Sequence, residues 1–175
     1  MTGNALGNAE GIQAVQVLQG EALMLNSQST LGETLALTPG VSSSYFGPNA
    51  SRPIIRGMDG DRIKILNNSA SSHDVSALSN DHAVPSDPLT VERIEVLRGP
   101  QGTLYGRNTT GGVVNVITAK ADPSEFKGQI DGTVGNYGYT QVRGMVNMPL
   151  SDTFAVRAAG MTLQRDGFVD NLYTG

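Results

Sequence analysis

Residues 91–122, "VERIEVLRGPQGTLYGRNTTGGVVNVITAKAD", place two apolar, β-branched runs on either side of a loop rich in Gly, Thr and Asn. Runs of this composition predict two strands, at residues 93–97 and 113–118, which are joined by a glycine loop at 98–112. The second strand is apolar on both faces except at Asn115, and this is typical of a strand that is covered on both sides. The stretch therefore predicts the centre of a packed sheet.

The residues before this stretch predict a mixed α+β unit. Val15 and Val17 indicate a short strand, and Thr30 with Glu33 forms a capping box that opens a helix, which Pro39-Gly40 ends. Further along, "RPIIRGMDGDRIKIL" predicts two strands joined at Asp59-Gly60, a pair suited to tight hairpins. Residues 67–90 are polar and predict a long loop, and loops of that length are usually functional or mobile.

After Pro123 the pattern changes to a period of two. Residues 126–134 and 141–150 alternate apolar with polar side chains, Ser151-Asp152 predicts the next turn, and residues 154–165 predict a third, less regular strand. We therefore expect a compact unit at residues 1–121 and antiparallel strands at 122–175. Three strands cannot close a barrel. The alternation fits either the first strands of a plugged outer-membrane barrel or a soluble meander with one face on a core.

Composition excludes several classes of function. The chain has no Cys, so it has no disulfide framework and no thiol chemistry. Eight basic and seven acidic residues are mixed within residues 52–120. This mixture does not predict the clustered basic surface that binds a nucleic acid. No apolar run approaches the roughly 18–20 residues of a membrane-spanning helix. The start lacks the features of a secretory signal, so we expect either a cytoplasmic protein or a chain without its export signal.

The glycine loop does not predict a catalytic or nucleotide site. A P-loop requires Lys followed by Ser or Thr after its last Gly, whereas Gly106 is followed by Arg107-Asn108. A dinucleotide fingerprint requires a helix after the loop, but here an apolar strand follows. No nucleophile, base and orienting group stand at a recognisable spacing. We therefore expect a shaped turn and no enzyme activity.

The segments "TLGETLALTPGV", "RPIIRGMDGDRIKIL", "VERIEVLRGPQGTLYG" and "GGVVNVIT", in this order, resemble the plug domain of TonB-dependent outer-membrane receptors over residues 14–120. The resemblance implies an α+β plug domain followed by antiparallel β-strands of an incomplete transmembrane β-barrel; the whole barrel has roughly 22 strands. It also implies a place in the outer membrane of a Gram-negative bacterium. The implied function is binding and active import of a scarce nutrient, with the plug gating the barrel and without a resident cofactor. The implied partners are the TonB-ExbB-ExbD energy-transducing complex, the protein's own barrel, outer-membrane lipid, and a metal ion or metal chelate.

The resemblance also assigns residues to plug–barrel contact or gating. In this sequence they are Arg56, Gly57, Glu95, Arg98, Gly99, Pro100, Tyr105, Gly106, Gly111 and Gly112. Arg56 and Arg98 can pair with carboxylates on the barrel wall, and in a wet lumen such pairs remain separable. The alternative is ion pairing inside the plug, for instance of Arg93 or Arg98 with Glu92 or Glu95.

The chain departs from the family in two respects. A TonB box, the short peptide that contacts TonB, is not recognisable before Ala14, and a signal peptide is absent. We therefore expect a fragment or a trimmed chain. A soluble plug-like binding module without transport activity is the alternative. Alternating strands after residue 175 would favour the receptor, and a stop codon there would favour the module.

Both histidines lie in the long polar loop, within His73-Asp74 and Asp81-His82. Imidazole nitrogen and carboxylate oxygen are suitable Zn²⁺ ligands, although neither pair has finger-type spacing. The segment resembles the plug loop of zinc-uptake members of the family, which implies that Zn²⁺ is the transported ligand. A siderophore or another organic chelate is the rival cargo, and a solvated loop with local turns is the structural alternative.

Overall fold

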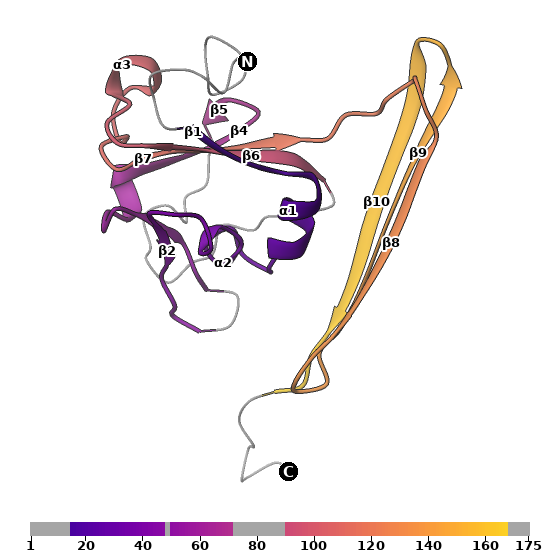
Figure 1. Ribbon diagram of the computed structural model, residues 1–175, viewed down its shortest axis with the longest axis horizontal. Helices are drawn as coiled ribbons and strands as arrows, with labels where there is room; N and C mark the ends of the chain where they lie inside the picture. The colour runs from indigo at the N-terminus through magenta and orange to yellow at the C-terminus, as the bar shows by residue number, and fades with distance from the viewer. Residues whose placement is uncertain (1–14, 48–49, 72–89, 168–175) are drawn as a thin grey trace. The chain divides into compact units, whose positions relative to one another are not determined.

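The computed structural model describes residues 15–47, 50–71 and 90–167. It divides the chain into two compact units, residues 1–119 and 120–175. Figure 1 shows the elements of both units. Each unit is described by itself.

The first unit is built on a five-stranded sheet with the strand order β1-β6-β7-β4-β5. The central strand β7 pairs antiparallel with β6 and parallel with β4, and the outer pairs β1–β6 and β4–β5 are antiparallel. The strands are β1 (Val15–Gln19), β4 (Ile63–Asn67), β5 (Ala70–Ser71), β6 (Val91–Arg98) and β7 (Gly112–Thr118). The predicted strands at 93–97 and 113–118 are confirmed as β6 and β7, at the centre of the sheet.

Short elements complete this unit. They are helices α1 (Gly20–Asn26), α2 (Leu31–Leu35) and α3 (Gly102–Tyr105), the 3-10 turn η1 (Gly60–Arg62), and the antiparallel pair β2 (Val41–Ser43) and β3 (Pro53–Ile55). The predicted capping box is confirmed, because the Thr30 hydroxyl accepts the backbone N–H of Glu33 and donates to its carboxylate.

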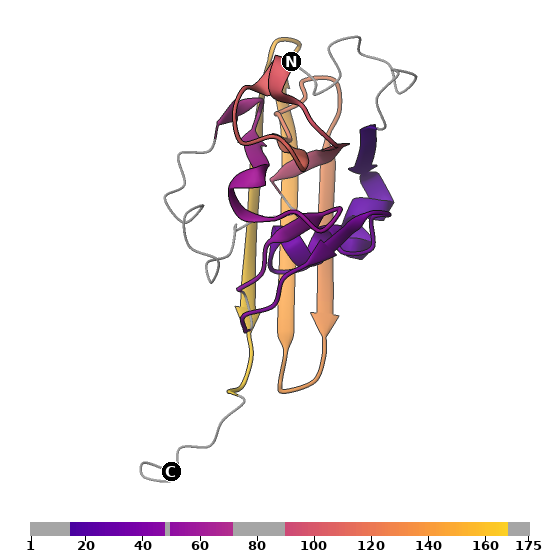
Figure 2. The same ribbon diagram turned by 90° about the vertical axis from the view of Figure 1, so that its left-hand side faces the viewer.

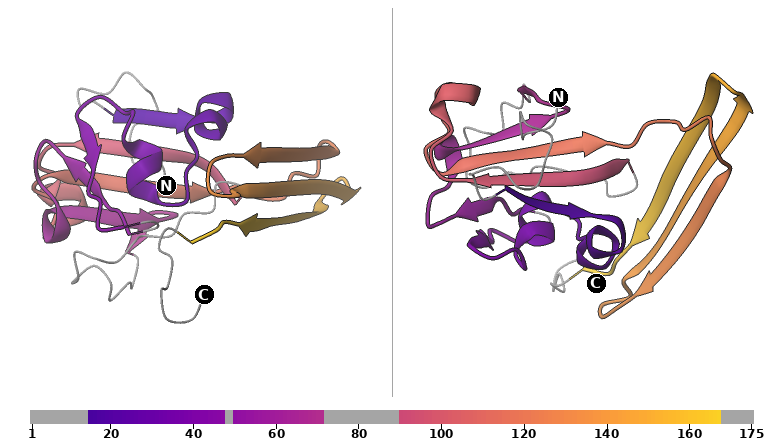
Figure 3. Two further views of the ribbon diagram at one scale, coloured as in Figure 1. Left: turned by 90° about the horizontal axis from the view of Figure 1, so that it is seen from below. Right: turned by 45° about the horizontal axis from the view of Figure 1, so that its top comes forward.

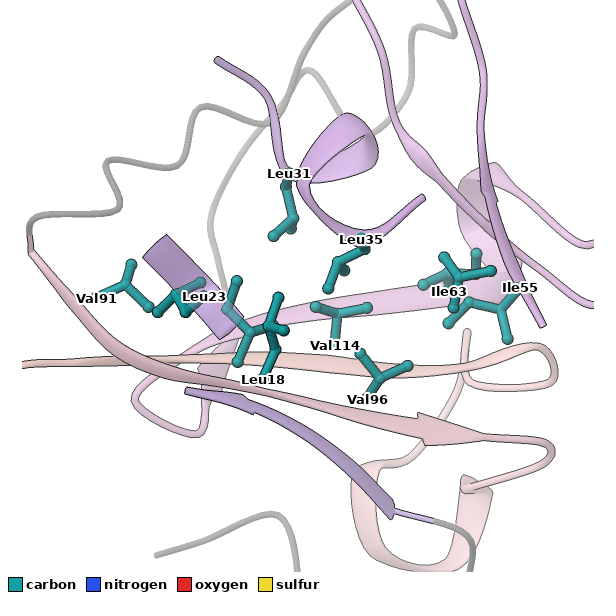
Figure 4. Packing of buried hydrophobic residues seen from close by; sticks show 11 residues of the cluster. Leu18, Leu23, Leu31, Leu35, Ile55, Ile63, Val91, Val96 and Val114 are labelled. Carbon is teal, nitrogen blue, oxygen red and sulfur yellow. The ribbon is translucent and has the colours of Figure 1, made fainter. Parts of the chain in front are cut away.

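The main core lies between one face of the sheet and helices α1 and α2. Figure 4 shows it, and the views of Figure 3 place these helices and β2–β3 on that face. Leu31 and Leu35 of α2 are fully buried there against sheet residues such as Val114. The cluster consists of Leu18, Leu23, Leu31, Leu35, Val41, Ile55, Ile63, Val91, Ile94, Val96 and Val114. Their burial supplies most of the apolar driving force for folding this unit.

The opposite face of the sheet has a smaller core beneath α3. Leu66, Leu97 and Val113 are buried there, with Val15 and Tyr105 packed against them. Strand β7 is therefore covered on both faces, as its sequence predicts. Its one polar inward residue, Asn115, is fully buried.

The hairpin predicted at Asp59-Gly60 is wrong. Strand β3 pairs with β2, whereas β4 pairs with β7 and β5. A tight hairpin of this type requires positive φ at both central residues, but Asp59 has an extended φ of −137°. Asp59-Gly60 instead leads into η1. Residues 67–71, the start of the predicted long loop, instead end β4 and form β5, because Asn68 and Ser69 have positive φ and turn the chain back. Residues 72–89 of that prediction lie outside the described residues.

The second unit is a three-stranded antiparallel sheet with the order β10-β9-β8. Figure 2 shows the three long strands side by side, coloured orange to yellow. They are β8 (Lys127–Val134), β9 (Thr140–Ser151) and β10 (Phe154–Gln164). The register sets Ile130 opposite Gly144 and Gly160 on one face, and Asp131 opposite Arg143 on the other. The predicted period of two is confirmed, and β8 and β10 are the edge strands of this sheet among the residues that the structure describes.

Candidate functional site

Arg56 stands in a two-residue turn at the end of β3. Ile55 and Met58 exchange both backbone hydrogen bonds, at 2.9 Å each, and Arg56 and Gly57 between them have φ of 51° and 78°. Two consecutive positive φ values define the type I′ turn, which is costly for a residue with a Cβ. The backbone N–H of Arg56 also donates to Gly40 O at 3.1 Å. The turn holds an exposed arginine in a strained backbone conformation, and such strain tends to persist at functional sites.

Arg98 is the last residue of β6 and reaches across to the turn that ends α2. Its Nη1 donates to Pro39 O at 2.5 Å. In the described part of the chain, its buried Nε has no hydrogen-bond acceptor. A buried donor without a partner costs free energy, so this guanidinium is incompletely satisfied within the unit.

The two arginines share one small region. A Cβ added to Gly99 would lie 3.6 Å from Nη1 of Arg56, and one added to Gly40 would lie 3.5 Å from Nη1 of Arg98. Both glycines have positive φ, which leaves room for the guanidinium groups. Within residues 15–47, 50–71 and 90–167, no carboxylate lies within ion-pairing distance of either arginine. The described residues therefore supply no carboxylate partner to these two guanidinium groups.

Glu95 does not belong to this arginine region. It is 3% exposed and lies on the α3 face of the sheet, where its carboxylate accepts from Arg93 Nε at 3.0 Å and from Asn115 Nδ2 at 3.3 Å. Arg93 also pairs with Glu92 at 2.6 Å. Arg93 thus pairs with carboxylates inside the unit, which is the alternative considered for the arginines. Arg98 instead binds a backbone carbonyl. The placement of Glu95 indicates a core role, not an outward contact.

Tyr105 ends α3 and holds the glycine loop on the sheet. Its carbonyl accepts from Lys64 Nζ at 2.7 Å, and its ring packs on the smaller core. Burial raises the pKa of the Tyr105 hydroxyl above its ordinary value, and the negative charge of Glu95 raises this pKa further. Gly106, with a φ of 75°, ends the helix. Sequence reasoning missed α3, which has only four residues.

Gly111 and Gly112 are buried where β7 begins. A Cβ on Gly112 would come within 2.3 Å of Leu97 O, and Gly112 has a φ of 151°. A Cβ on Gly111 would lie 3.0 Å from the Cβ of Met58. Close backbone approach inside the unit explains both glycines.

The structure brings together only part of the predicted set. Arg56, Gly57, Arg98, Gly99 and Pro100 lie at one end of the unit, next to Gly111, whose carbonyl accepts the Gly99 backbone N–H at 3.0 Å. Glu95 and Tyr105 lie on the face of the sheet that carries the smaller core. The acceptor role of Pro39 was not predicted, because a carbonyl carries no residue-specific signal.

The predicted metal ligands His73, Asp74, Asp81 and His82 lie outside the described residues. In the part of the chain that is described, no three His, Cys, Asp or Glu residues are grouped to hold a metal ion. None of the helices there is both long and apolar enough to cross a membrane.

Comparison with known proteins identifies the family. Residues 8–113 match the model of the TonB-dependent Receptor Plug Domain. The fold and the site define a plug domain followed by amphipathic strands. This arrangement is that of the class of outer-membrane receptors. The chain belongs to the TonB-dependent receptor plug domain family.

Curated relatives match along most of the chain. The iron-regulated outer membrane virulence protein of Vibrio cholerae is 31% identical over 182 residues, which cover 95% of this chain and 28% of that protein. The vitamin B12 transporter BtuB of Photobacterium profundum is 30% identical, over 90% of this chain and 26% of that protein. The chain thus spans about a quarter of the length of these relatives. The first is named as an outer membrane protein and the second as a transporter, and the outer membrane of a Gram-negative cell is the location of this chain as well.

Solved structures agree on the fold. The pyoverdine receptor FpvA of Pseudomonas aeruginosa has a TM-score of 0.75 at 21% identity, over 92% of this chain and 21% of that one. The ferric-catecholate receptor Fiu of Escherichia coli has a TM-score of 0.72 at 24% identity, over 90% of this chain and 22% of that one.

Proposed function

We propose that the chain is the plug and the first barrel strands of a receptor that binds a scarce nutrient and imports it actively. The TonB-ExbB-ExbD complex supplies the energy, and the plug gates the barrel. The chain contributes about a quarter of such a protein, so the remaining barrel strands lie outside it. The outer-membrane relatives favour this receptor over a soluble binding module.

The observation that carries the proposal is the arginine region formed by Arg56 and Arg98. Two guanidinium groups near each other repel, and a nearby carboxylate pair would remove the repulsion. Arg98 retains a buried N–H without an acceptor in the described chain. Carboxylates on the inner wall of the barrel are the partners we propose. Ion pairs in a wet lumen contribute only about 0–1 kcal/mol each, so they can hold the plug and still separate.

The second unit supports membrane insertion. One face of its sheet carries Ile130, Val134, Val142, Val146, Met148 and Val156, and the other carries Lys127, Gln129, Asp131, Gln141, Arg143 and Asn147. Ile130 is 80% exposed and Val134 83%, which is unusual for residues of this size in a sheet without a lipid or protein partner. Apolar-out and polar-in alternation is the pattern of an outer-membrane barrel, so we propose that this face contacts lipid.

For the cargo we propose a metal chelate such as a siderophore. Two of the relatives are named for iron regulation and for vitamin B12, and a third, from Yersinia enterocolitica, is a ferrioxamine receptor at 29% identity over 91% of this chain and 22% of that protein. Tyr45 and Phe46, 70% and 60% exposed between β2 and β3, offer flat apolar surfaces suited to an organic ligand. None of the relatives named above is a zinc receptor. Zinc bound through His73, Asp74, Asp81 and His82 is therefore the rival outcome.

The proposal is tested by uptake into cells that carry the complete receptor. Radiolabelled ferric ferrioxamine, cobalamin and Zn²⁺ are supplied separately, and each uptake is compared with that of matched cells that lack TonB. We expect TonB-dependent accumulation of a chelate, and no change when Asp81 and His82 are replaced by Ala. TonB-dependent Zn²⁺ uptake that those replacements abolish would favour the zinc cargo. Equal accumulation of every probe in both cell types would contradict active transport.

A further inference from the structure

Asn147 of β9 is bonded to the segment that leads into β8. Its Oδ1 accepts the backbone N–H of Asp122 at 2.9 Å, and its Nδ2 donates to Asp122 O and Glu125 O, each at 2.8 Å. The side chain of Asn147 is 1% exposed. One amide group therefore satisfies three backbone groups of residues 122–125.

The same segment has internal hydrogen bonds. The Asp122 carboxylate accepts the Ser124 backbone N–H at 2.8 Å and the Ser124 hydroxyl at 2.6 Å. Glu125 forms an ion pair with Lys127 at the start of β8. We call residues 122–125 the anchor segment. It has a defined conformation and is attached to β9 as well as to β8.

On the other side of the junction, the chain is still bonded to the plug sheet at Ala119. The Ala119 backbone N–H donates to Thr90 O at 2.8 Å, one residue beyond the end of β7. Only Lys120 and Ala121 lie between this bond and the anchor segment. Three virtual bonds connect the Cα atoms of residues 119 and 122, so these atoms cannot separate by more than roughly 11 Å.

We propose that Asn147 makes the anchor segment part of the strand unit and that Lys120-Ala121 is the joint between the two units. The consequence for transport rests on the proposed function. While the anchor segment is held, movement of the plug during transport would turn about Lys120-Ala121 and leave residues 122–125 with the strand unit.

An amide side chain is required for this role. Asn supplies an acceptor and two donors in one plane, which match one N–H and two carbonyls. An Asp side chain would place a charge against two carbonyl oxygens, and Ala would leave three backbone groups without partners.

The test is amide hydrogen exchange at single-residue resolution on the complete receptor in detergent. In the unmodified protein we expect the Asp122 amide to exchange at least about tenfold more slowly than those of Lys120 and Ala121, after correction for their intrinsic rates. Equal exchange at Ala121 and Asp122 would overturn the proposal. This comparison uses the native protein and does not depend on whether the receptor transports anything.

Variants assign the effect to Asn147. Asn147→Ala should accelerate exchange at Asp122 about tenfold or more and leave Ile94 and Val114 in the plug core unchanged. Gln141→Ala, on the same polar face of β9, is the matched control and should not change exchange at Asp122, because among the described residues its amide bonds only Met161 Sδ. Unchanged exchange at Asp122 in the Asn147→Ala variant would overturn the assignment.

Discussion

Glu95 and Asn115 lie directly opposite each other on β6 and β7, and the Asn115 amide donates to the buried Glu95 carboxylate at 3.3 Å. The same Asn115 side chain accepts the Ser69 backbone N–H at 2.9 Å through its Oδ1. A polar link therefore runs through the middle of the plug sheet to the turn between β4 and β5. Arg93 and Asn115 both help to satisfy the buried charge in this position, which would be costly without hydrogen-bonded partners.

Removing the Glu95 carboxylate should destabilise the plug. Glu95→Ala leaves Arg93 and Asn115 without their buried acceptor, and we expect a loss of about 2–4 kcal/mol in the free energy of unfolding. Glu92→Gln is the matched control, because Glu92 binds the same Arg93 but is 51% exposed, and it should cost less than about 1 kcal/mol. Urea unfolding of residues 1–121, followed by circular dichroism, measures both. Similar losses for the two variants would show that burial of Glu95 is unimportant.

Gly112 should tolerate no side chain. Gly112→Ala would place a Cβ 2.3 Å from Leu97 O at a φ of 151°, so we expect a loss of about 3 kcal/mol or more in the free energy of unfolding. Gly102→Ala, in α3, meets nothing within 4 Å and should change this free energy by less than about 1 kcal/mol. The same unfolding experiment compares them. A near-neutral Gly112→Ala would contradict the close approach of β6 and β7.

Tyr105 should ionise only at high pH. Its pKa is raised by burial and then by the charge of Glu95, so the folded plug favours the neutral phenol. The resulting stability is complete below pH 10, the ordinary value, and is lost as the pH rises through the higher pKa of the folded state. Tyrosinate absorbance measures this titration, and Tyr105→Phe should remove a step that lies above pH 10. Glu95→Gln should lower the pKa of Tyr105 while leaving it raised, since burial is the larger cause. A titration curve that Tyr105→Phe leaves unchanged above pH 10 would contradict this assignment.

The two units should behave differently in isolation. Residues 1–121 contain the buried clusters on both faces of the plug sheet, and we expect them to give a folded monomer. Residues 122–175 expose large apolar side chains and two open strand edges, so we expect aggregation in the absence of detergent. Size-exclusion chromatography with light scattering distinguishes these outcomes. A monodisperse, protease-resistant monomer of residues 122–175 in water would contradict the membrane-facing role of its apolar face.

The sequence predicts those elements whose signals are local. The capping box at Thr30, the doubly covered strand β7 and the alternation in β8 and β9 all appear in the structure. The hairpin at Asp59-Gly60 was wrong because β4 takes a parallel partner almost fifty residues away, and no local pattern encodes such a pairing. The positive-φ turn falls instead at Arg56-Gly57.

The candidate site was predictable only in part. The family resemblance indicated Arg56 and Arg98, but not that Arg98 binds the Pro39 carbonyl or that Glu95 is buried. These facts depend on how distant segments meet. The sequence did not single out Asn147 among the alternating polar residues of its strand. Its three hydrogen bonds go to backbone groups, which any residue could supply.

The most direct test of the central claim is the separation of binding from uptake in cells that carry the complete receptor. Arg56→Gln with Arg98→Gln should leave initial binding of the transported chelate within about twofold of the unmodified receptor and raise its TonB-dependent uptake rate about tenfold, because the proposed contacts that hold the plug on the barrel wall are lost. Arg62→Gln, an exposed arginine of η1, is the matched control and should change neither. Unmodified uptake by the double variant would contradict the proposal that these two arginines couple the plug to the barrel.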